Sequence, residues 1–547
     1  MQRRLHSSMY AILALVMAIV MALTGCADSN NNGGENGDSS AKGSNSKTPA
    51  TNGSGSDKND AAKPSGERIT LKVELFDRNN TPAGQPPITD NFMTQYVQKN
   101  FGDPNNIDVE FVTVPRAEEV DKLNVLMASN SAPDIVFTYN KPTVQNYVKS
   151  GGLTDLGPLI EEHGPNLKKV LGPSLPYGIF EGKQYVIPAL RVIQSQTTTF
   201  IRKDWLDQLK LPIPETTEQF VNTMREFKKQ DPGKTGGKVV PYGYIDVFHM
   251  MPLVNSFWKW DEITDQELYA VPRWQQPGSK EGYRLLNQMY NEGLIDPDFA
   301  LHDDFSQHFA QQVVNGIAGA ATPNTNEPVY NGYYSNLNAN NPDAVLEAID
   351  PFSTPDGKHP KPIYEPIGAY LMVPAASKNA EAAVKYLNWM ADPANILVLQ
   401  NGEEGVSYKM SDEGLPVLLD TPEAQNLLYN YYDYCIILNG KYISTEDPNK
   451  NIAANAFDLN FKDFTVKSIQ SGTNDGYTLP RVDIPVDAEI KYAKILEDFE
   501  KEMLAKIVTA KPDQFDKVYD DQVKEYMAMG GTAVMEGKMA AYAEFYK

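Results

Sequence analysis

Apolar residues recur at every second position in the first part of the folded chain. The segments 71–75 and 107–111 both alternate apolar with polar side chains, a period that predicts half-buried strands. The segment 134–138 is more uniformly apolar and predicts a third, more buried strand.

Helical spacing separates these strands. An apolar stripe within 92–97 predicts one helix, and Pro115 is expected to open a second helix with Val120, Leu123 and Met127 on one face. The order strand, helix, strand, helix, strand indicates an α/β fold with a mostly parallel sheet covered by helices on both faces.

Later segments continue the mixed pattern. Thr216 and Gln219 have the spacing of a capping box at the start of a helix. Another helix is expected from about Asn379 to 392–393, and the tail from about Asp513 has helical composition interrupted at 530–531. A chain of 547 residues should divide into more than one lobe.

The N-terminal segment has the features of an export signal. Arg3 and Arg4 precede an apolar run, 10–23, that is shorter than the roughly 20 residues a membrane span requires. The string Leu-Thr-Gly-Cys at 23–26 resembles a bacterial lipobox, which implies a signal peptide over 1–25 and a lipid-bearing Cys26. The alternative is an ordinary cleaved signal that happens to contain a cysteine.

Residues 26–67 are expected to form the lipidated start and a flexible linker. From 27 to 68 the chain holds no aromatic and no large aliphatic residue, so it cannot bury enough apolar surface to fold. The chain has 2 cysteines. If Cys26 carries lipid, Cys435 has no partner, and its apolar surroundings indicate a buried, inert thiol.

The charge balance excludes one class of partner. The formal net charge is −22, and loss of Arg3 and Arg4 with the signal would bring it to −24. Such a chain repels nucleic acid and anionic lipid surfaces, so no nucleic-acid partner is expected.

Seven short strings, taken together and in order, resemble family 1 extracellular solute-binding proteins, especially the large lipoprotein branch linked to glycan uptake. They lie at 122–137, 152–156, 182–188, 201–206, 291–297, 381–390 and 402–408. The resemblance implies a two-lobe periplasmic-binding-protein-like fold (type II) whose hinged lobes close on a ligand. It places the N-terminal lobe at 68–190 plus 352–405, and the C-terminal lobe at 191–351 plus 406–547.

One departure from that family concerns calcium. Many relatives carry an acidic calcium loop that corresponds to 231–241 here. This chain has Val239 and Val240 in place of the acidic pair, and Lys234 adds a positive charge. Because calcium needs six to eight oxygen ligands, we expect no calcium in this loop. We also expect no cofactor and assign no metal-binding residue, while a metal elsewhere in the chain stays open.

Two groups of residues are candidate ligand contacts. Sugars bind to flat aromatic faces and to planar charged or amide groups. The spacing of Asp246 and Phe248 is similar to a ligand motif of the maltodextrin-binding relative, and Trp258 and Trp260 would share one side if extended. The alternative places both tryptophans in a lobe core.

The second group follows predicted strand ends, where ligands of doubly wound sheets bind. Asp77 and Arg78 follow the first strand and Tyr139 the third, while Arg191 follows the first crossover between lobes. The alternatives are a solvated turn for Asp77 and Arg78 and an interlobe salt bridge for Arg191.

Sequence motifs for catalysis or metal binding are weaker than those for ligand binding. The string 232–235 lacks the first glycine of a phosphate loop, and His302, Asp303, Asp304 and His308 are more typical of a solvated loop than of a metal site. No serine–histidine arrangement supports a hydrolase triad, although acidic pairs suited to glycoside cleavage stay open.

The leading hypothesis is a monomeric, lipid-anchored binding protein on the outer face of the cell membrane. It would capture an oligosaccharide for the permease subunits of an ABC importer, without catalysis. The alternatives are a surface-anchored glycan-degrading enzyme, or a peptide-binding or signalling receptor on the same fold.

Overall fold

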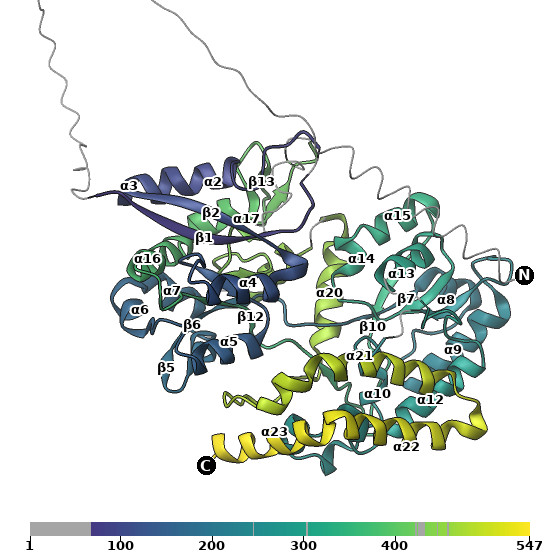
Figure 1. Ribbon diagram of the computed structural model, residues 1–547. Helices are drawn as coiled ribbons and strands as arrows, with labels where there is room; N and C mark the ends of the chain where they lie inside the picture. Colours follow the sequence, from purple (N-terminus) through teal and green to yellow (C-terminus); the bar gives the residue numbers. More distant parts are fainter. Residues whose placement is uncertain are drawn as a thin grey trace, which may run out of the picture. The chain divides into compact units, whose positions relative to one another are not determined.

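The computed structural model describes residues 67–81, 83–243, 246–301, 305–421, 424, 433–445, 447–456 and 459–547. The chain divides into two compact units, Met1–Ala62 and Lys63–Lys547, and all described residues belong to the second. The predicted signal, Cys26 and the linker up to residue 66 therefore lie outside the described residues. Within the second unit, separate groups of buried apolar side chains surround two sheets and form two lobes (Figure 1).

The first lobe contains the three strands predicted from the sequence, two from alternation and one from a uniformly apolar run. β1 (Ile69–Asp77) and β2 (Ile107–Pro115) run parallel, in a register that pairs Ile69 with Ile107. A parallel bridge between Val73 and Ile135 joins β1 to the strand that continues as β3 (Val136–Thr138). The buried side chains of these strands form the centre of the lobe.

Later segments complete this sheet. β12 (Ile367–Met372) is antiparallel both to β3 and to β6 (Val186–Arg191). β15 (Leu438–Asn439) adds a parallel pair on the other side of β6. Strands from the N-terminal, central and later parts of the chain thus share one sheet, so the lobe cannot form from a single continuous segment.

β15 also changes one expected boundary. The segment 434–438 contributes five buried side chains to the core of the first lobe, because its apolar run covers the edge of the sheet beside β6. This segment falls within the range 406–547 that the resemblance assigns to the second lobe, and its contacts place it in the first. The other lobe ranges stay a prediction.

The helices of the first lobe follow the expected order with one difference. α2 (Phe92–Val97) and α16 (Ala380–Met390) lie where the apolar stripes predict them. Pro115, however, ends β2 with extended backbone, and α4 begins only at Glu119 and ends at Ala128. The pairing of Pro115 with Asp77 keeps this proline in the sheet.

The second lobe is built on a four-stranded sheet in the order β10, β7, β9, β8. Their bounds are Leu346–Ile349, Thr199–Arg202, Ala318–Ala321 and Val240–Gly243. β8 and β9 are parallel, whereas β7 is antiparallel to both of its neighbours. The core of this lobe is rich in aromatic side chains, among them Trp205, Phe220, Tyr242 and Phe352.

The predicted capping box is half correct. Thr216 accepts a hydrogen bond from the amide of Gln219 at 3.2 Å and starts α9 (Thr217–Gln230). The Gln219 side chain bonds the amide of Glu215 at 2.8 Å instead of that of Thr216. The helix start is therefore as predicted, with the return bond shifted by one residue.

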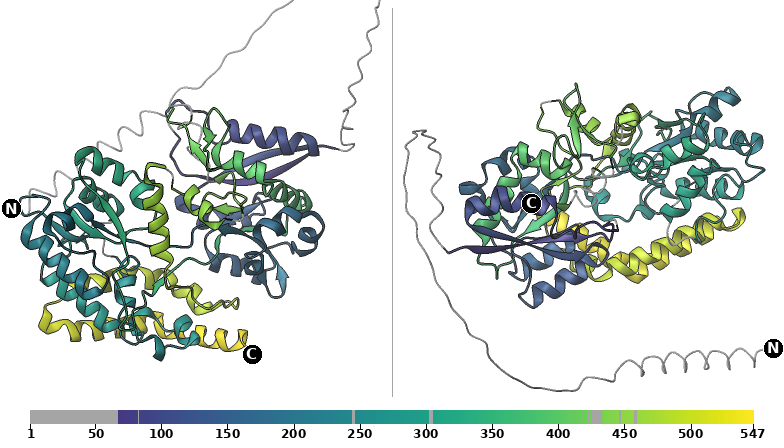
Figure 2. Two further views of the ribbon diagram at one scale, coloured as in Figure 1. Left: turned by 180° about the vertical axis from the view of Figure 1, so that it is seen from behind. Right: turned by 90° about the horizontal axis from the view of Figure 1, so that it is seen from above.

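The C-terminal helices form one helical arm of the second lobe. α21 (Asp487–Thr509), α22 (Phe515–Tyr526) and α23 (Thr532–Phe545) follow one another, and α21 packs into the aromatic core (Figures 1 and 2). A kink at Gly530, with φ of 145°, separates α22 from α23, as the glycine pair predicts. Ring atoms of Tyr492 leave no room for a side chain at Gly530.

Two connecting segments run side by side between the lobes. The first follows β6 and leads to β7, and the second leads back to β12. An antiparallel bridge pairs Ser195 with Ile363, and the amide of Tyr364 donates to the carbonyl of Gln194 at 2.7 Å. This pairing fixes the side chains of both segments relative to one another.

Candidate functional site

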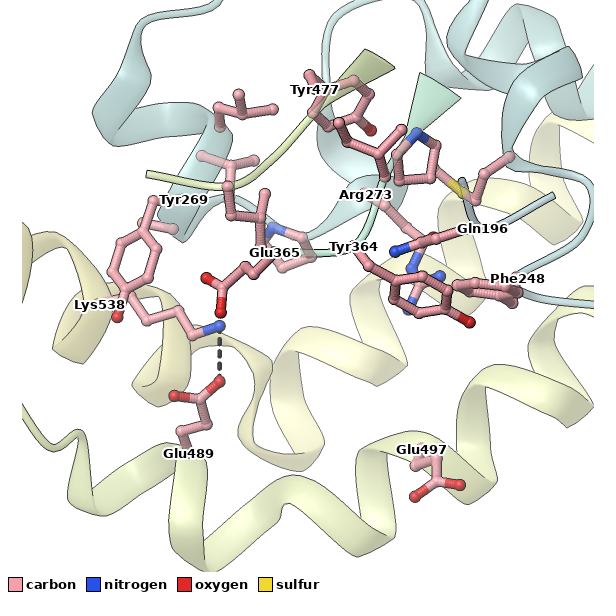
Figure 3. Close-up of a pocket in the computed structure, with 18 of the residues that line it drawn as sticks. Gln196, Phe248, Tyr269, Arg273, Tyr364, Glu365, Tyr477, Glu489, Glu497 and Lys538 are labelled. Carbon is pink, nitrogen blue, oxygen red and sulfur yellow. Dashed lines mark ion pairs between the residues drawn. The ribbon is translucent and has the colours of Figure 1, made fainter. Parts of the chain in front are cut away.

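A cavity of about 720 Å³ lies beside the paired connecting segments. Its walls come from the first lobe, both connecting segments, the second lobe and the C-terminal helices (Figure 3). Aromatic and polar side chains alternate around it, including Tyr139, Gln196, Phe248, Tyr364 and Tyr477. A cavity of this size and mixed lining is typical of small-ligand sites.

Arg191 and Tyr364 meet where the two connecting segments are paired. The guanidinium of Arg191 stacks on the ring of Tyr364, 4.0 Å from its centroid. Its Nε donates to the carbonyl of Ile367 at 3.3 Å. Burial lowers the pKa of Arg191, because little in its surroundings compensates the charge.

Three further aromatic rings line the cavity from different directions. Phe248 and Trp258 come from the second lobe, and Tyr477 comes from β16 (Gly476–Tyr477). The hydroxyl of Tyr477 accepts from the Asn255 side chain at 2.7 Å, which fixes the ring. These rings and Tyr364 offer flat apolar surface of the kind that sugar rings cover.

Three side chains of the cavity wall also carry buried polar atoms that no described protein group satisfies. The side-chain oxygens of Gln196 and Gln276 and the indole nitrogen of Trp258 are buried without a hydrogen-bond partner among the described residues. A buried polar atom left unpaired costs about 1–3 kcal/mol. These atoms lie beneath the cavity surface, so a ligand would reach them only if the side chains rotated.

Two ion pairs neutralise much of the charge around the cavity. Lys538 pairs with Glu489 at 2.7 Å (Figure 3). Arg273 pairs with Glu500 at 2.9 Å. Glu365 points toward the side of the cavity that holds Lys538 and Tyr269, away from Phe248 and Gln196 (Figure 3). Carboxylates therefore lie on both sides of the cavity, because Glu497 is on the side of Phe248 (Figure 3). Arg191 is held at the connecting segments by its stack on Tyr364.

Four of the eight predicted contact residues line this cavity: Tyr139, Arg191, Phe248 and Trp258. The guanidinium of Arg116 lies 4.5 Å from the ring centroid of Tyr139, so it covers part of that ring. Arg191 has no carboxylate partner among the described residues. The structure therefore does not show the interlobe salt bridge that was the alternative for this residue. Whether these residues contact a ligand stays a prediction.

Asp246 supports the loop that carries Phe248. Its carboxylate accepts from the amides of Phe248 and His249 at 2.7 Å each, and from the His249 ring at 2.5 Å. Burial opposes ionisation, but the bonds from His249 outweigh it and lower the pKa of Asp246. Asp246 therefore positions Phe248 and is not part of the described cavity wall.

Asp77 and Arg78 also lie outside the described cavity wall. Asp77 is exposed and caps a turn through the amide of Asn79, as the solvated-turn alternative predicts. Arg78 instead holds the buried carboxylate of Asp433 with two bonds of 2.6 and 2.9 Å. Its guanidinium is engaged in a structural pair that links β1 to the segment before β15.

Trp260 faces a second cavity. This cavity lies between the start of α9, the loop after α10 (Met251–Asn255) and the loop 353–358, and Trp258 separates it from the first. The indole nitrogen of Trp260 donates to the carbonyl of Asn255 at 3.1 Å, and its ring packs 4.8 Å from Tyr477. The two tryptophan rings are neighbours, but only Trp258 reaches the first cavity.

Several cavity residues were missed from sequence. Tyr364, Glu365 and Gln196 lie on connecting segments without helical or strand periodicity, and Arg273 and Lys538 come from loops and helices distant in the chain. One signal was present for the connecting segment. An aromatic and an acidic residue stand between two prolines at 362–366, directly before a buried strand.

In the loop after α9, the carboxylate of Asp231 is hydrogen-bonded by protein groups of the same loop. Asp231 has φ of 45°, and its carboxylate accepts from Thr235 at 2.9 and 2.8 Å and from the amide of Gly237 at 3.1 Å. Among the described residues, no group of three or more His, Cys, Asp or Glu side chains is placed to hold a metal. Residues 302–304 and the side chain of His308 lie outside the described part.

The chain resembles known proteins over much of its length. The family model described as bacterial extracellular solute-binding protein matches residues 85–396. Lipoprotein LipO of Bacillus subtilis (strain 168) is 26% identical over 321 residues, which cover 56% of this chain and 62% of LipO. The polygalacturonan/rhamnogalacturonan-binding protein YtcQ of the same strain is 25% identical over 326 residues, with 56% and 62% covered.

The match covers less than two thirds of either relative. A solved structure of the S. pneumoniae substrate-binding protein FusA in complex with kestose superposes with a TM-score of 0.63 at 18% identity, covering 87% of this chain and 99% of FusA. That likeness shows the two-lobe fold. No helix among the described residues is long and apolar enough to cross a membrane. From the family match over more than half its length, the chain belongs to the bacterial extracellular solute-binding proteins.

Proposed function

We propose that this protein binds an oligosaccharide in the cavity beside its connecting segments and presents it, unchanged, to the permease of an ABC importer. The observation that carries the proposal is the joint presence of aromatic rings and of planar polar side chains, among them Arg191 and Gln196, on that cavity. Rings cover the apolar faces of a sugar, and amide and guanidinium groups bind its hydroxyls.

The placement of the cavity also favours binding coupled to a change of shape. Its wall includes residues of both lobes and of both connecting segments. A ligand that contacts all three would favour the arrangement in which the lobes approach one another. A permease could then recognise the loaded form by the relative position of the two lobes.

The relatives support a saccharide as the ligand. The name of YtcQ states that it binds polygalacturonan and rhamnogalacturonan, and that of FusA describes a fructooligosaccharide transporter subunit. Both are binding proteins in name, which favours binding over catalysis for this chain. A peptide ligand or a signalling role on the same fold is a separate outcome that the experiment below distinguishes.

We further propose that Cys26 anchors the protein to the outer face of the cell membrane as a monomer. The lipobox-like string at 23–26 and the name of the relative LipO support this. Labelling with radioactive palmitate in cells should mark the wild type, and the Cys26→Ala variant should be unlabelled and released to the medium. A labelled Cys26→Ala variant would contradict the anchor.

Titration calorimetry against glycan fragments tests the binding function. Oligosaccharides from pectin, xylan and mannan are added to the folded part of the chain, and the bound fraction is recovered and analysed by mass. Binding with recovery of intact sugar supports the proposal. Shortened products would show a glycan-degrading enzyme, and binding of peptides alone would show a peptide receptor.

A further inference from the structure

We propose that the ligand is an acidic oligosaccharide and that Arg191 binds a sugar carboxylate. This inference rests on the proposed function and specifies its ligand class. Three cationic side chains of the described residues line the cavity. Two of them pair with carboxylates, and Arg191 does not.

The other two cations on the cavity wall are neutralised within the protein. Lys538 pairs with Glu489 and Arg273 pairs with Glu500. Arg191 instead contacts a ring and one carbonyl oxygen, and the titratable groups that influence it, Tyr139 and Tyr364, are neutral phenols with raised pKa values. A half-buried cation without a counter-ion is costly, and an anionic ligand group would compensate it.

Arg78 shows what a compensated guanidinium looks like in this chain. Its side chain donates two hydrogen bonds to the Asp433 carboxylate, and these bonds raise the pKa of Arg78. For Arg191 burial lowers the pKa instead. The two arginines therefore differ in whether the protein supplies the anion.

The geometry at Arg191 suits a planar carboxylate. The ring of Tyr364 supports one face of the guanidinium, and Nε is used by the Ile367 carbonyl. Both terminal nitrogens have no acceptor among the described residues. Two parallel N–H donors match the two oxygens of a carboxylate, which a neutral hydroxyl does not.

The cavity also orients such a ligand. Glu365 lies on the side that holds Lys538, away from Gln196 and Phe248 (Figure 3). An acidic sugar at that side would be repelled by Glu365, whose carboxylate suits hydroxyl donors. Glu497 lies on the side of Phe248, so the position of the ligand's carboxylate is set by the terminal nitrogens of Arg191 on Tyr364, with a hydroxyl-bearing ring toward Glu365.

Matched acidic and neutral sugars test this inference. The probes are oligogalacturonate and its methyl ester, which share one backbone, and a glucuronic-acid-bearing xylo-oligosaccharide with its unsubstituted counterpart. Calorimetry on the folded part of the chain should show the acidic member of a pair binding about 10- to 100-fold more tightly. The preference should shrink as salt is raised.

Two variants assign the preference to Arg191. Arg191→Gln should bind acidic and neutral members with similar affinity, and Arg191→Lys should keep a reduced preference because it retains the charge without the planar fork. Arg284→Gln is the control, since it removes one positive charge from an exposed pair with Asp516 outside the cavity. It should keep the full preference. Thermal melting checks that each variant is folded.

The outcomes separate the inference from the function. Equal or tighter binding of the neutral members by the wild type would overturn the acidic ligand and leave the saccharide function standing. A preference that survives in folded Arg191→Gln would overturn the role of Arg191. Failure of every sugar in the panel to bind would contradict the proposed function and this inference together.

Discussion

At the scale of single residues, Tyr364 connects the main features of the cavity. Its ring supports Arg191 on one face, its amide pairs the two connecting segments, and its side chain lines the cavity beside Phe248. Loss of the ring would remove both aromatic surface for the ligand and the support of the guanidinium.

The Tyr364→Ala variant should therefore bind oligosaccharide more weakly by roughly 2 kcal/mol, the scale of burying one large apolar side chain. Phe545→Ala is the matched control, because Phe545 is an aromatic residue at the C-terminal end of α23, 38% exposed, and lies outside the described cavity wall. Calorimetry with the tightest ligand measures both. Unchanged affinity in Tyr364→Ala would show that the ring is only structural.

Glu74 provides a test at the same scale that concerns stability. Its side chain is buried in the first lobe, one oxygen accepts from the amide of Phe137 at 3.0 Å, and burial raises its pKa to about 8. The folded-state pKa lies above the unfolded value of about 4.3. The folded state thus binds more protons between these values, so the free energy of unfolding falls as pH rises from about 4.5 to about 8.

The Glu74→Gln variant has no proton to lose at this position. We expect it to melt at a higher temperature than the wild type at pH 8 and above, with the difference shrinking toward zero near pH 4.5. Calorimetric melting from about pH 4.5 to about pH 9 measures this difference, because that range spans the unfolded and the folded pKa of Glu74. A difference that is constant with pH would show that Glu74 does not titrate in this window.

At the scale of elements, the Arg78–Asp433 pair fastens β1 to the segment that leads into β15. The two residues are 355 positions apart, and the carboxylate side chain is 2% exposed. The pair closes the sheet of the first lobe with a strand from the later part of the chain. Without Arg78 a buried carboxylate would lose its partner.

The Arg78→Ala variant should lower the free energy of unfolding by about 2 kcal/mol or more, a figure reduced from the usual cost because Arg78 is one-third exposed. Arg284→Ala is the control, since Arg284 makes a similar two-bond pair with the exposed Asp516. It should cost much less, because water screens exposed pairs. Denaturant unfolding measures both, and equal losses would contradict the structural role of Arg78.

The loop after α9 makes a prediction about metal. The carboxylate of Asp231 is already used by Thr235 and Gly237, and the positions of the acidic pair in relatives are Val239 and Val240. We expect the melting temperature to be the same with calcium and with a chelator. A rise with calcium that is lost in Asp231→Ala would show that this loop binds the ion.

At the scale of the whole molecule, local patterns predicted elements better than they predicted contacts. Alternation located β1 and β2, and a uniformly apolar run located the strand that ends in β3. Tyr139, predicted from a strand end, and Arg191, predicted from the crossover, both line the cavity. Asp77 and Arg78, predicted from a strand end, lie outside the described cavity wall, because a turn and a distant carboxylate already use them. Pattern alone does not show which partners the rest of the chain supplies.

Tertiary pairing accounts for what the sequence did not reveal. The second connecting segment has no periodic signal, and it becomes part of the site only through its bridge to Ser195. The strand at 438–439 is likewise too short to be recognised before its place beside β6 is known. Arg191 was predicted as a ligand contact. The sequence could not show that no carboxylate of the described residues pairs with it, because that depends on how distant segments pack.

A crystal structure of the protein with its tightest saccharide tests the proposed binding site most directly. We expect an intact sugar in the cavity of the connecting segments, stacked on Tyr364 or Phe248, with a carboxylate at the terminal nitrogens of Arg191. A sugar seated instead in the cavity of Trp260, or one that leaves Arg191 without a contact, would contradict it.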